Sequence, residues 1–352
     1  MTTVQTTLYH RIDEPNSRND LADYHIAIVI PVFNESRHIK QVLESIPSYI
    51  RSIIVVDDGS TDDTLHKIEE RMEIDSRIQC VQHRTNQGVG MAMMTGYRQA
   101  IELSASIVVK MDGDGQMSSE SLPKLISPLL SGVADYSKGS RFAYTSDASE
   151  MPLVRRIGNV TLGFMTKVAA GYWNLLDPTN GFTAIRTDVL KLMRFERLDP
   201  KFFFETSMLS ELYLLKAVVR DIPMAASYGN ETSHLSPLKA MFQFPPRLLR
   251  RFLRRIFLRH VVYDFSIGAI YTLVGGPLGM FGLVFGILNW ARYSSMNLGA
   301  PTGTVVIPAL CILVSIQLIL RAIDADIQSV PRIPINLGPL AQNRLHHHQL
   351  QL

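Results

Sequence analysis

The stretch VVKMDGDGQM (residues 108–117) joins a run of apolar residues to a cluster of oxygen-bearing side chains. The apolar run, Ile107–Val109, predicts a buried strand, and Asp112, Asp114 and Gln116 follow it at alternate positions. Alternate residues at the end of a strand face the same side, so these three side chains can converge. Carboxylate and amide oxygens suit a hard divalent ion such as Mg²⁺ or Mn²⁺. The stretch therefore predicts a metal site at the end of a core strand.

A D-x-D spacing alone is weak evidence for a metal site, because it occurs by chance in many loops. The interpretation therefore depends on the rest of the chain. Apolar runs alternate with amphipathic stretches over the first 111 residues. The predicted strands are 26–32, 53–57, 78–81 and 106–111, and the predicted helices are 36–46, 62–74 and 90–103. This alternation predicts an α/β domain with a mostly parallel sheet and helices on both faces.

Acids, amides and glycines follow all four predicted strands. They lie in Pro31–Glu35, Asp57–Ser60, Asn86–Gly90 and Asp112–Gln116. In parallel sheets, ligands bind beyond the carboxyl ends of the strands. Helix capping is the alternative, and it would explain Asp58, Ser60 or Asn34 individually. Capping does not explain acids at both the second and the fourth strand ends, whose charges repel unless a cation lies between them.

Composition limits the class of protein. The chain has 352 residues, 46% of them hydrophobic and 19% charged, which excludes a disordered chain. Cys80 and Cys311 are too few and too far apart for a disulfide framework or a thiolate metal site, and they fit a reducing compartment. Residues 1–24 are polar and lack the apolar segment of a signal peptide, so we expect a flexible arm there.

The charge is divided unevenly along the chain. Residues 241–352 carry ten arginines, no lysine and three aspartates, a net charge of +7. The whole chain has 35 basic and 32 acidic residues, so the first 240 residues carry 25 basic and 29 acidic groups, a net charge of −4. The part of the chain before residue 241 is therefore acidic, and the tail is basic.

Two long uncharged runs in the tail predict a membrane anchor. They are Phe265–Ala291 and Tyr293–Leu320, and about 20 apolar residues span a bilayer. We expect two transmembrane helices at about 266–290 and 303–323, forming a hairpin over 264–325. Arginines before the first run and Arg321 after the second predict that both outer ends, and the tail 326–352, are cytoplasmic. Two buried core helices are the alternative, and a transporter is excluded because the runs offer no polar path.

The segment 241–263 predicts a basic amphipathic helix at the membrane interface. Pro245 and Pro246 suit the first turn of this helix. Spacings of three and four place six arginines on one side and apolar residues on the other. The arginines are Arg247, Arg250, Arg251, Arg254, Arg255 and Arg259. Their role is either a positive-inside anchor alone or, in addition, the attraction of a lipid phosphate. The apolar opposite face argues against nucleic-acid binding.

The chain at this point resembles a known family. Four segments resemble, in order, the nucleotide-sugar-binding half of family 2 glycosyltransferases with the GT-A fold: IVIPVFNES (28–36), VVDDGSTDDT (55–64), NQGVGMAMMTGYRQA (86–100) and VKMDGDGQM (109–117). Later segments are similar to polyprenyl-phosphate (dolichol-phosphate-type) sugar synthases: KGSRF (138–142), PLVRRIGN (152–159), DPTNGFTAI (177–185) and FFFE (202–205). The resemblance covers residues 25–325 and implies that residues 25–240 form a cytoplasmic catalytic domain. It implies inverting transfer of one sugar from a nucleotide sugar to an undecaprenyl-type phosphate at the cytoplasmic face of the inner (plasma) membrane.

The resemblance also implies roles for individual residues. The nucleoside pocket would be lined by Pro31, Phe33, Glu35 and Asp57, with Asp58 and Asn86 nearby. The ion, Mg²⁺ or Mn²⁺, and the diphosphate would be held by Asp112, Asp114 and Gln116. The acceptor phosphate would be bound by Arg141 with Arg155 or Arg156, and by Arg255 of the basic helix; Asp177 and Thr179 would face the sugar or the acceptor. Structural readings stay open for some of these: a surface ion pair for Arg141, a turn for Asp177 and a helix cap for Glu205.

The predicted reaction requires positive charge near the acceptor phosphate and the leaving diphosphate, and it requires no strong general base. A phosphate monoester has a second pKa of about 6, so it is largely ionised at neutral pH. Arginines would orient it, and a metal would draw charge from the leaving diphosphate. One loop departs from the family pattern. Family members often have an arginine followed by Gly-x-Ser-Lys in this loop, whereas this chain has Ala226 at the arginine position and His234 at the lysine position.

Other readings remain at the level of sequence. A family 2 transferase with another lipid or glycan acceptor is the main alternative, and a non-enzymatic sensor of nucleotide sugars is a third. UDP is favoured over GDP as the donor nucleotide, and the sugar is not readable. Glycines at 275, 276, 279 and 282 favour packing of the hairpin against other copies, so we expect a homo-oligomer.

Overall fold

The computed structural model describes residues 21–141, 153–224, 237–263 and 265–335. The chain divides into two compact units. The first comprises Met1–Arg251 together with Pro331–Leu352, and the second comprises Phe252–Val330.

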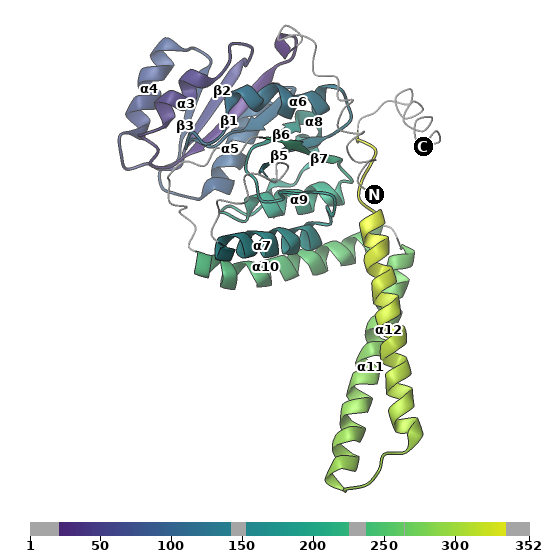
Figure 1. Ribbon diagram of the computed structural model, residues 1–352. Helices are drawn as coiled ribbons and strands as arrows, with labels where there is room; N and C mark the ends of the chain where they lie inside the picture. The colour runs from purple at the N-terminus through teal and green to yellow at the C-terminus, as the bar shows by residue number, and fades with distance from the viewer. Residues whose placement is uncertain (1–20, 142–152, 225–236, 264, 336–352) are drawn as a thin grey trace. The chain divides into compact units, whose positions relative to one another are not determined.

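The first unit is built on a seven-stranded mixed sheet (Figure 1). Its strands are β1 (Ile26–Val32), β2 (Ser52–Asp57), β3 (Ile78–Gln82), β4 (Ile107–Lys110), β5 (Tyr136–Ser140), β6 (Thr183–Arg186) and β7 (Val219–Pro223). The order across the sheet is β3-β2-β1-β4-β6-β5-β7. The four strands β3, β2, β1 and β4 are mutually parallel, whereas β6 runs antiparallel to β4 and β5. The predicted α/β fold with a mostly parallel sheet is confirmed.

Helices cover both faces of this sheet, because the buried strands are apolar on both sides. The helices of the first unit are α3 (Ile39–Ser45), α4 (Thr64–Ile74), α5 (Val89–Glu102), α6 (Leu122–Leu130), α7 (Leu153–Ala170), α8 (Thr187–Leu192) and α9 (Phe204–Leu214). Residues of α3, α4 and α6 share one core cluster with Ile28 and Ile30 of β1. On the opposite face, α5 packs on β1 so closely that a Cβ on Gly96 would lie 2.2 Å from Cγ1 of Val29.

The pairing register brings three strand ends to one edge of the sheet. Val32, Asp57 and Gln82 are aligned as neighbours at the ends of β1, β2 and β3. Lys110, the last residue of β4, pairs with Val29, which lies three residues before Val32. The chain after β4 therefore reaches the same edge of the sheet at about Gly113, three residues after Lys110. The polar segments that follow the four predicted strands therefore do gather at one edge of the sheet, as expected for parallel strands.

The prediction that the basic helix begins at Pro245 is wrong. Helix α10 runs from Pro237 to Phe257 and contains both prolines. Apolar residues upstream already follow helical spacing, and the ring of Phe244 contacts that of Phe203 with centroids 5.6 Å apart. The helix therefore continues through the two prolines, although each proline removes one backbone hydrogen bond. Within the first unit, Arg247 lies 3.5 Å from Asp199 and Arg251 lies 3.0 Å from Glu211, so these arginines form ion pairs with the body.

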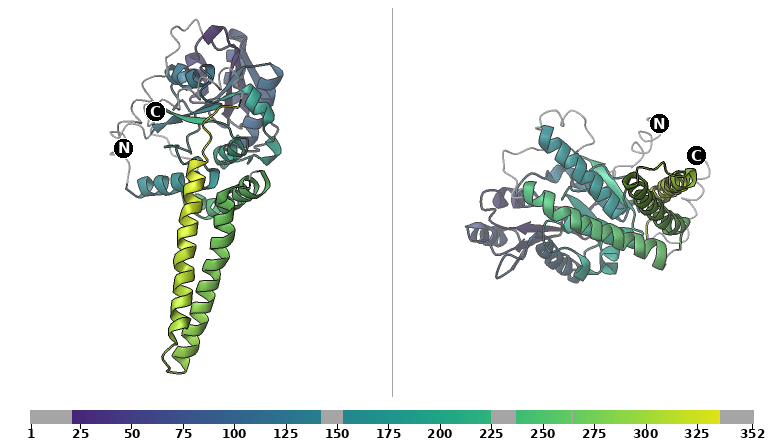
Figure 2. Two further views of the ribbon diagram at one scale, coloured as in Figure 1. Left: turned by 90° about the vertical axis from the view of Figure 1, so that its right-hand side faces the viewer. Right: turned by 90° about the horizontal axis from the view of Figure 1, so that it is seen from below.

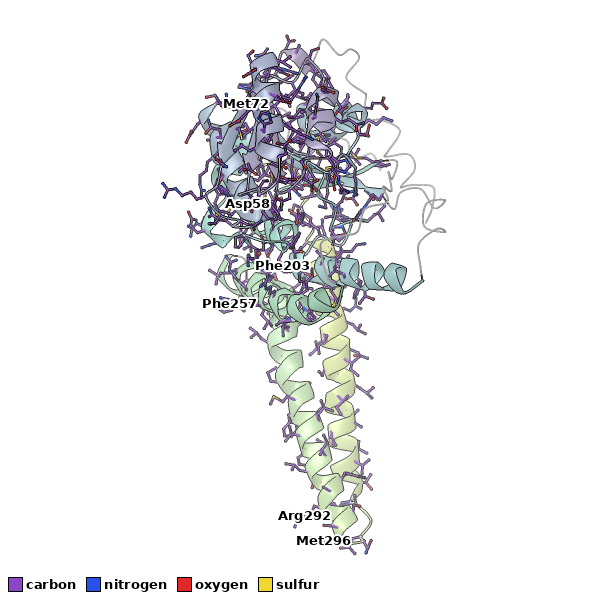
Figure 3. All side chains as sticks on the ribbon, turned by 90° about the vertical axis from the view of Figure 1, so that its left-hand side faces the viewer. Asp58, Met72, Phe203, Phe257, Arg292 and Met296 are labelled. Carbon is purple, nitrogen blue, oxygen red and sulfur yellow. The ribbon has the colours of Figure 1, made fainter. Side chains whose placement is uncertain are left out.

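The second unit is a pair of long helices, α11 (Ile267–Ser295) and α12 (Thr302–Gln328), preceded by a π-helical turn over Leu258–Tyr263. Both helices are long and apolar enough to cross a membrane, and they run side by side (Figure 2). Each is longer than its predicted span. Figure 3 shows Arg292 and Met296 at the turn that joins them.

Glycines of α11 contact α12 of the same chain. A Cβ on Gly279 would lie 2.3 Å from the Ser315 hydroxyl, and one on Gly282 would lie 3.0 Å from the Pro308 carbonyl. Ser315 Oγ donates a hydrogen bond of 2.7 Å to the Gly275 carbonyl. Gly275, Gly279 and Gly282 therefore pack against α12 of the same chain, whereas a Cβ added to Gly276 would have no atom within 4 Å. Assembly with other copies stays a prediction.

Candidate functional site

The loops after β1 and β2 are tied together by polar contacts. Asn34 adopts the left-handed backbone conformation, with φ of 59°. Its N–H donates to Ser60 Oγ at 3.0 Å, and its side-chain Oδ1 accepts from the Thr61 N–H at 2.8 Å. These contacts hold the segment around Phe33 and Glu35 against the segment that follows β2. They explain Asn34 and Ser60 as linking residues rather than helix caps.

Asp57 is a buried carboxylate at the end of β2. Its exposure is 0%, and its Oδ1 accepts the Ser60 N–H at 3.1 Å. Its other oxygen, Oδ2, is buried without a hydrogen-bond partner among the residues that the structure describes. A buried carboxylate oxygen without a donor is costly, so a ligand that donates an N–H or O–H would stabilise this position.

Asp58 is also buried, but it is fully engaged in a different role. Its carboxylate accepts the backbone N–H groups of Gln87 and Gly88 at 2.9 and 2.7 Å. It also contacts His83 Nδ1 at 2.7 Å, and His83 Nε2 contacts Thr95 Oγ1 at 3.0 Å. Asp58 therefore fixes the loop that opens α5. The sequence reasoning missed His83, which had no motif to mark it.

The predicted metal loop follows β4 and offers two carboxylates. Asp114 Oδ1 accepts the Gln116 N–H at 3.0 Å, while the Asp112 carboxylate faces Lys110. Two glycines shape the loop: a Cβ on Gly113 would lie 2.7 Å from Val32 Cγ1, and Gly115 has φ of +76°. In the described part of the chain, no three His, Cys, Asp or Glu side chains converge as a metal site. The loop thus fits a hard cation only in part, and oxygens from another molecule would have to complete the coordination.

A buried ion-pair bridge adjoins this loop. Lys110, 3% exposed, places its ammonium 3.2 Å from Asp112 Oδ1 and 2.7 Å from Glu205 Oε1. Burial alone would lower the pKa of Lys110, but the two carboxylates outweigh it and raise the pKa above its usual value. Glu205 lies in the first turn of α9 without acting as its N-cap, which is Phe203. Neither Lys110 nor the ion-pair role of Glu205 was predicted from the sequence.

Arg141 and Asp177 form a second ion pair, after β5. Arg141 Nε donates to Asp177 Oδ2 at 2.9 Å, and Thr179 Oγ1 donates to Oδ1 at 3.2 Å. Burial would raise the pKa of Asp177, but the Arg141 guanidinium and the Lys138 ammonium outweigh it and lower the pKa below its usual value. The Arg141 side chain is 44% exposed and Asp177 is fully buried, so the pair has an accessible positive end.

Two further buried charges lie behind this pair. Lys138 Nζ donates to the Asn180 carbonyl, and burial lowers the pKa of Lys138 to about 8. Asp221 of β7 accepts the Leu176 N–H, and burial raises the pKa of Asp221 to about 6. Both groups interact electrostatically with Asp177, so the three form one cluster of buried ionisable side chains.

The remaining predicted site residues are distributed as follows. Pro31 is buried, Phe33, Asn86 and Gln116 are exposed, and Glu35 is half-buried. Arg155 and Arg156 lie in the first turn of α7, but their side chains fall outside the described residues, as do Ala226 and His234 entirely. Arg255 belongs to the second unit, where it is buried and pairs with Asp326 through contacts of 2.6 and 2.9 Å. Its guanidinium is thus already engaged by a carboxylate.

Comparison with known proteins identifies the family. The profile described as Glycosyl transferase family 2 matches residues 27–193. The chain is 34% identical over 187 residues to the UDP-N-acetylglucosamine--dolichyl-phosphate N-acetylglucosaminyltransferase of Methanococcus voltae, covering 49% of this chain and 74% of that protein. It is 25% identical over 293 residues to the dolichol-phosphate mannosyltransferase of Pyrococcus furiosus, covering 81% of this chain and 76% of that protein.

The fold also has a counterpart among solved structures. Glucosyl-3-phosphoglycerate synthase from Mycobacterium tuberculosis, in complex with Mn²⁺, UDP-glucose and phosphoglyceric acid, superposes with a TM-score of 0.51 at 20% identity. The superposition covers 67% of this chain and 82% of that one, which supports the GT-A fold. From the family profile, the relatives and the sheet with its polar carboxyl edge, the chain belongs to glycosyl transferase family 2 and is a glycosyltransferase.

Proposed function

We propose that the protein transfers a single sugar, with inversion, from a nucleotide sugar to a membrane polyprenyl phosphate. The observation that carries the proposal is the Arg141–Asp177 pair, an exposed guanidinium anchored on a buried carboxylate. A guanidinium held in this way is already fixed in one orientation, so less side-chain entropy is lost when it binds a phosphate bidentately. Relatives named as acting on dolichyl phosphate or undecaprenyl phosphate support this acceptor class.

The donor would bind at the carboxyl edge of β1, β2 and β4. The unpartnered Oδ2 of Asp57 would accept a hydrogen bond from the nucleobase, and the exposed ring of Phe33 would contact the nucleoside. Asp112, Asp114 and Gln116 would hold Mg²⁺ or Mn²⁺ together with the diphosphate, which would supply the oxygens that the protein lacks. When bound, the ion would stabilise the charge that develops on the leaving diphosphate. UDP is the favoured nucleotide, as in the name of the Methanococcus relative.

The protein's own groups then account for the transfer. Arg141 would place one acceptor phosphate oxygen behind the anomeric carbon of the sugar. That oxygen forms the new bond to the carbon as the bond to the diphosphate oxygen breaks, and the nucleoside diphosphate leaves with the electron pair. Since the acceptor is largely ionised at neutral pH, no side chain has to remove a proton.

The membrane anchor would keep the enzyme beside its lipid substrate. Helices α11 and α12 would form a two-span hairpin, and the arginines near its outer ends favour a cytoplasmic catalytic domain. On this basis we assign residues 25–240 to the catalytic domain, 241–263 to an interface helix and 264–325 to the hairpin. Arg155 and Arg156 remain candidates for additional contacts to the lipid phosphate, whereas the buried guanidinium of Arg255 is held by Asp326 in the second unit.

The test uses the full-length protein purified in detergent. Undecaprenyl phosphate, Mg²⁺ or Mn²⁺ and a panel of UDP- and GDP-sugars are supplied, and released nucleoside diphosphate is measured. We expect release that requires the lipid phosphate, the metal and Asp114, so that Asp114→Ala abolishes it. Release that proceeds equally with a non-phosphorylated lipid or a glycan would contradict the proposed acceptor.

A further inference from the structure

Lys110 is a buried cation in contact with a candidate metal ligand. It is the last residue of β4, and its ammonium lies 3.2 Å from Asp112 Oδ1. An ammonium at this distance neutralises part of the carboxylate's charge. The same carboxylate is the first acid of the predicted metal loop. A divalent ion approaching Asp112 therefore meets a positive charge that is already in place.

The packing holds Lys110 in this position. A Cβ added to Gly181 would lie 2.7 Å from Lys110 Nζ and 2.9 Å from Asp112 Oδ2. The backbone at Gly181 thus closes one side of the pair and leaves no space for a side chain. A lysine that is 3% exposed has lost its water shell, so it cannot swing away into solvent without disturbing its neighbours.

Glu205 holds Lys110 from the other side. Its Oε1 lies 2.7 Å from the ammonium, and it comes from α9, 95 residues further along the chain. The bridge has two opposing effects on a nearby divalent ion. Lys110 repels the ion, and Glu205 offsets part of that repulsion, so the balance between them sets how strongly the loop attracts a bare cation.

We propose that Lys110, held by Glu205, makes divalent-ion binding depend on the diphosphate of the donor. Lys110 serves as the counter-ion of Asp112 until the nucleotide binds, an inference that rests on the proposed donor site. The loop alone then attracts the ion weakly. The diphosphate adds negative charge and further oxygen ligands, which outweigh Lys110. Ion and nucleotide consequently bind together rather than independently.

The experiment measures binding, not turnover, on the full-length protein in detergent. Free Mn²⁺ is followed by electron paramagnetic resonance to give its dissociation constant without nucleotide. Binding of radiolabelled UDP is measured by equilibrium dialysis with and without Mn²⁺, and GDP is tested in parallel. By linkage, the factor by which Mn²⁺ tightens nucleotide binding equals the factor by which nucleotide tightens Mn²⁺ binding.

Wild-type protein is expected to bind Mn²⁺ weakly alone and to bind nucleotide at least about tenfold more tightly with Mn²⁺, which is within the usual range of coupling between two sites. Lys110→Met should tighten Mn²⁺ binding without nucleotide by at least about tenfold, because it removes the repulsion between the ammonium and the ion. Glu205→Gln should act in the opposite direction, because it leaves the Lys110 charge uncompensated. The double variant should return toward wild type. Lys191→Met, at an exposed lysine of α8, is the matched control and should change neither constant.

The outcomes separate the inference from the function on which it rests. Opposite shifts in the two single variants support the inference, and a purely structural bridge would instead weaken binding in both. Should Lys110→Met not fold, the double variant Lys110→Met/Glu205→Gln decides. Weaker Mn²⁺ binding in Glu205→Gln that the double variant restores supports the inference, and weaker binding in both variants overturns it. Unchanged Mn²⁺ affinity without nucleotide in Lys110→Met also overturns it while leaving the donor site intact. Failure of wild-type protein to bind UDP or GDP with Mn²⁺ would overturn the donor site itself, and the inference with it.

Discussion

Arg141 Nε donates a 2.9 Å hydrogen bond to Oδ2 of Asp177, which is fully buried. The buried carboxylate fixes the orientation of the Arg141 guanidinium, and the Arg141 side chain is exposed. We therefore treat these two residues, 36 positions apart in the chain, as one candidate phosphate-binding unit whose orientation the buried carboxylate fixes.

Arg141→Gln is expected to weaken use of the lipid acceptor. The variant loses the charge-assisted contacts to the phosphate, so kcat/KM for undecaprenyl phosphate should fall about a hundredfold, the equivalent of about 3 kcal/mol. The KM for the nucleotide sugar should change little. Initial-rate kinetics with each substrate varied in turn give both constants. Arg220→Gln, at an exposed arginine of β7, serves as the control, and an unaltered acceptor KM and kcat in Arg141→Gln would refute the assignment.

Asp58→Asn is expected to loosen the loop that opens α5. The amide keeps one acceptor oxygen where the carboxylate accepts two backbone N–H groups and contacts His83. Leaving one of these donors unsatisfied should lower the free energy of unfolding by about 1–3 kcal/mol. Thermal unfolding in detergent measures the change. Ser131→Ala, which removes a single hydroxyl contact at the end of α6, should have a much smaller effect, and equal effects of the two changes would count against this role.

Asp221 predicts a specific pH dependence of stability. Its pKa in the folded protein is about 6, against an ordinary value of 3.8. Between these values the folded protein binds a proton that the unfolded chain does not, so stability from this group rises as pH falls from about 6 to about 4. Asp221→Asn removes this contribution. The difference in thermal stability between wild type and Asp221→Asn should therefore vary with pH in this window and be constant above pH 7; a flat difference throughout would contradict the shifted pKa.

The hairpin offers a matched pair of glycine substitutions. Gly279→Ala places a methyl group 2.3 Å from Ser315 Oγ, whereas Gly276→Ala places one where no atom lies within 4 Å. The first should destabilise the pairing of α11 and α12 by about 1–3 kcal/mol through overpacking, and the second should be close to neutral. Thermal unfolding of the two variants in the same detergent compares them directly. Similar stability of both would argue against the packing of Gly279 on Ser315.

The sequence predicted those parts of the fold that depend on local pattern. Alternation of apolar and amphipathic segments located the first four strands and the helices between them within a few residues, because period and burial are readable over short windows. The polar strand ends were located for the same reason. The start of α10 was missed, since a rule based on proline at the first turn ignored the apolar spacing upstream of Pro245.

Contacts between distant segments could not be read in this way. Lys110 meets Glu205 across 95 positions, and His83 meets Asp58 across 25. The first pair depends on the packing of α9 near the end of β4, and the second depends on the parallel pairing of β2 with β3. A lysine at a strand end has no local pattern that distinguishes a buried ion pair from an exposed charge. The predicted roles of Asp112, Asp114 and Gln116 in holding the ion remain to be tested in the same way.

Mass spectrometry of the lipid product tests the central claim most directly. The purified protein is incubated with undecaprenyl phosphate, the donor selected from the nucleotide-sugar panel and Mn²⁺, and the lipids are extracted. The account predicts a single new species whose mass is that of the lipid phosphate plus one sugar residue, absent with Asp114→Ala. A species carrying a diphosphate, several sugars or no phosphate, or nucleotide release without any lipid product, would contradict transfer of one sugar to a polyprenyl phosphate.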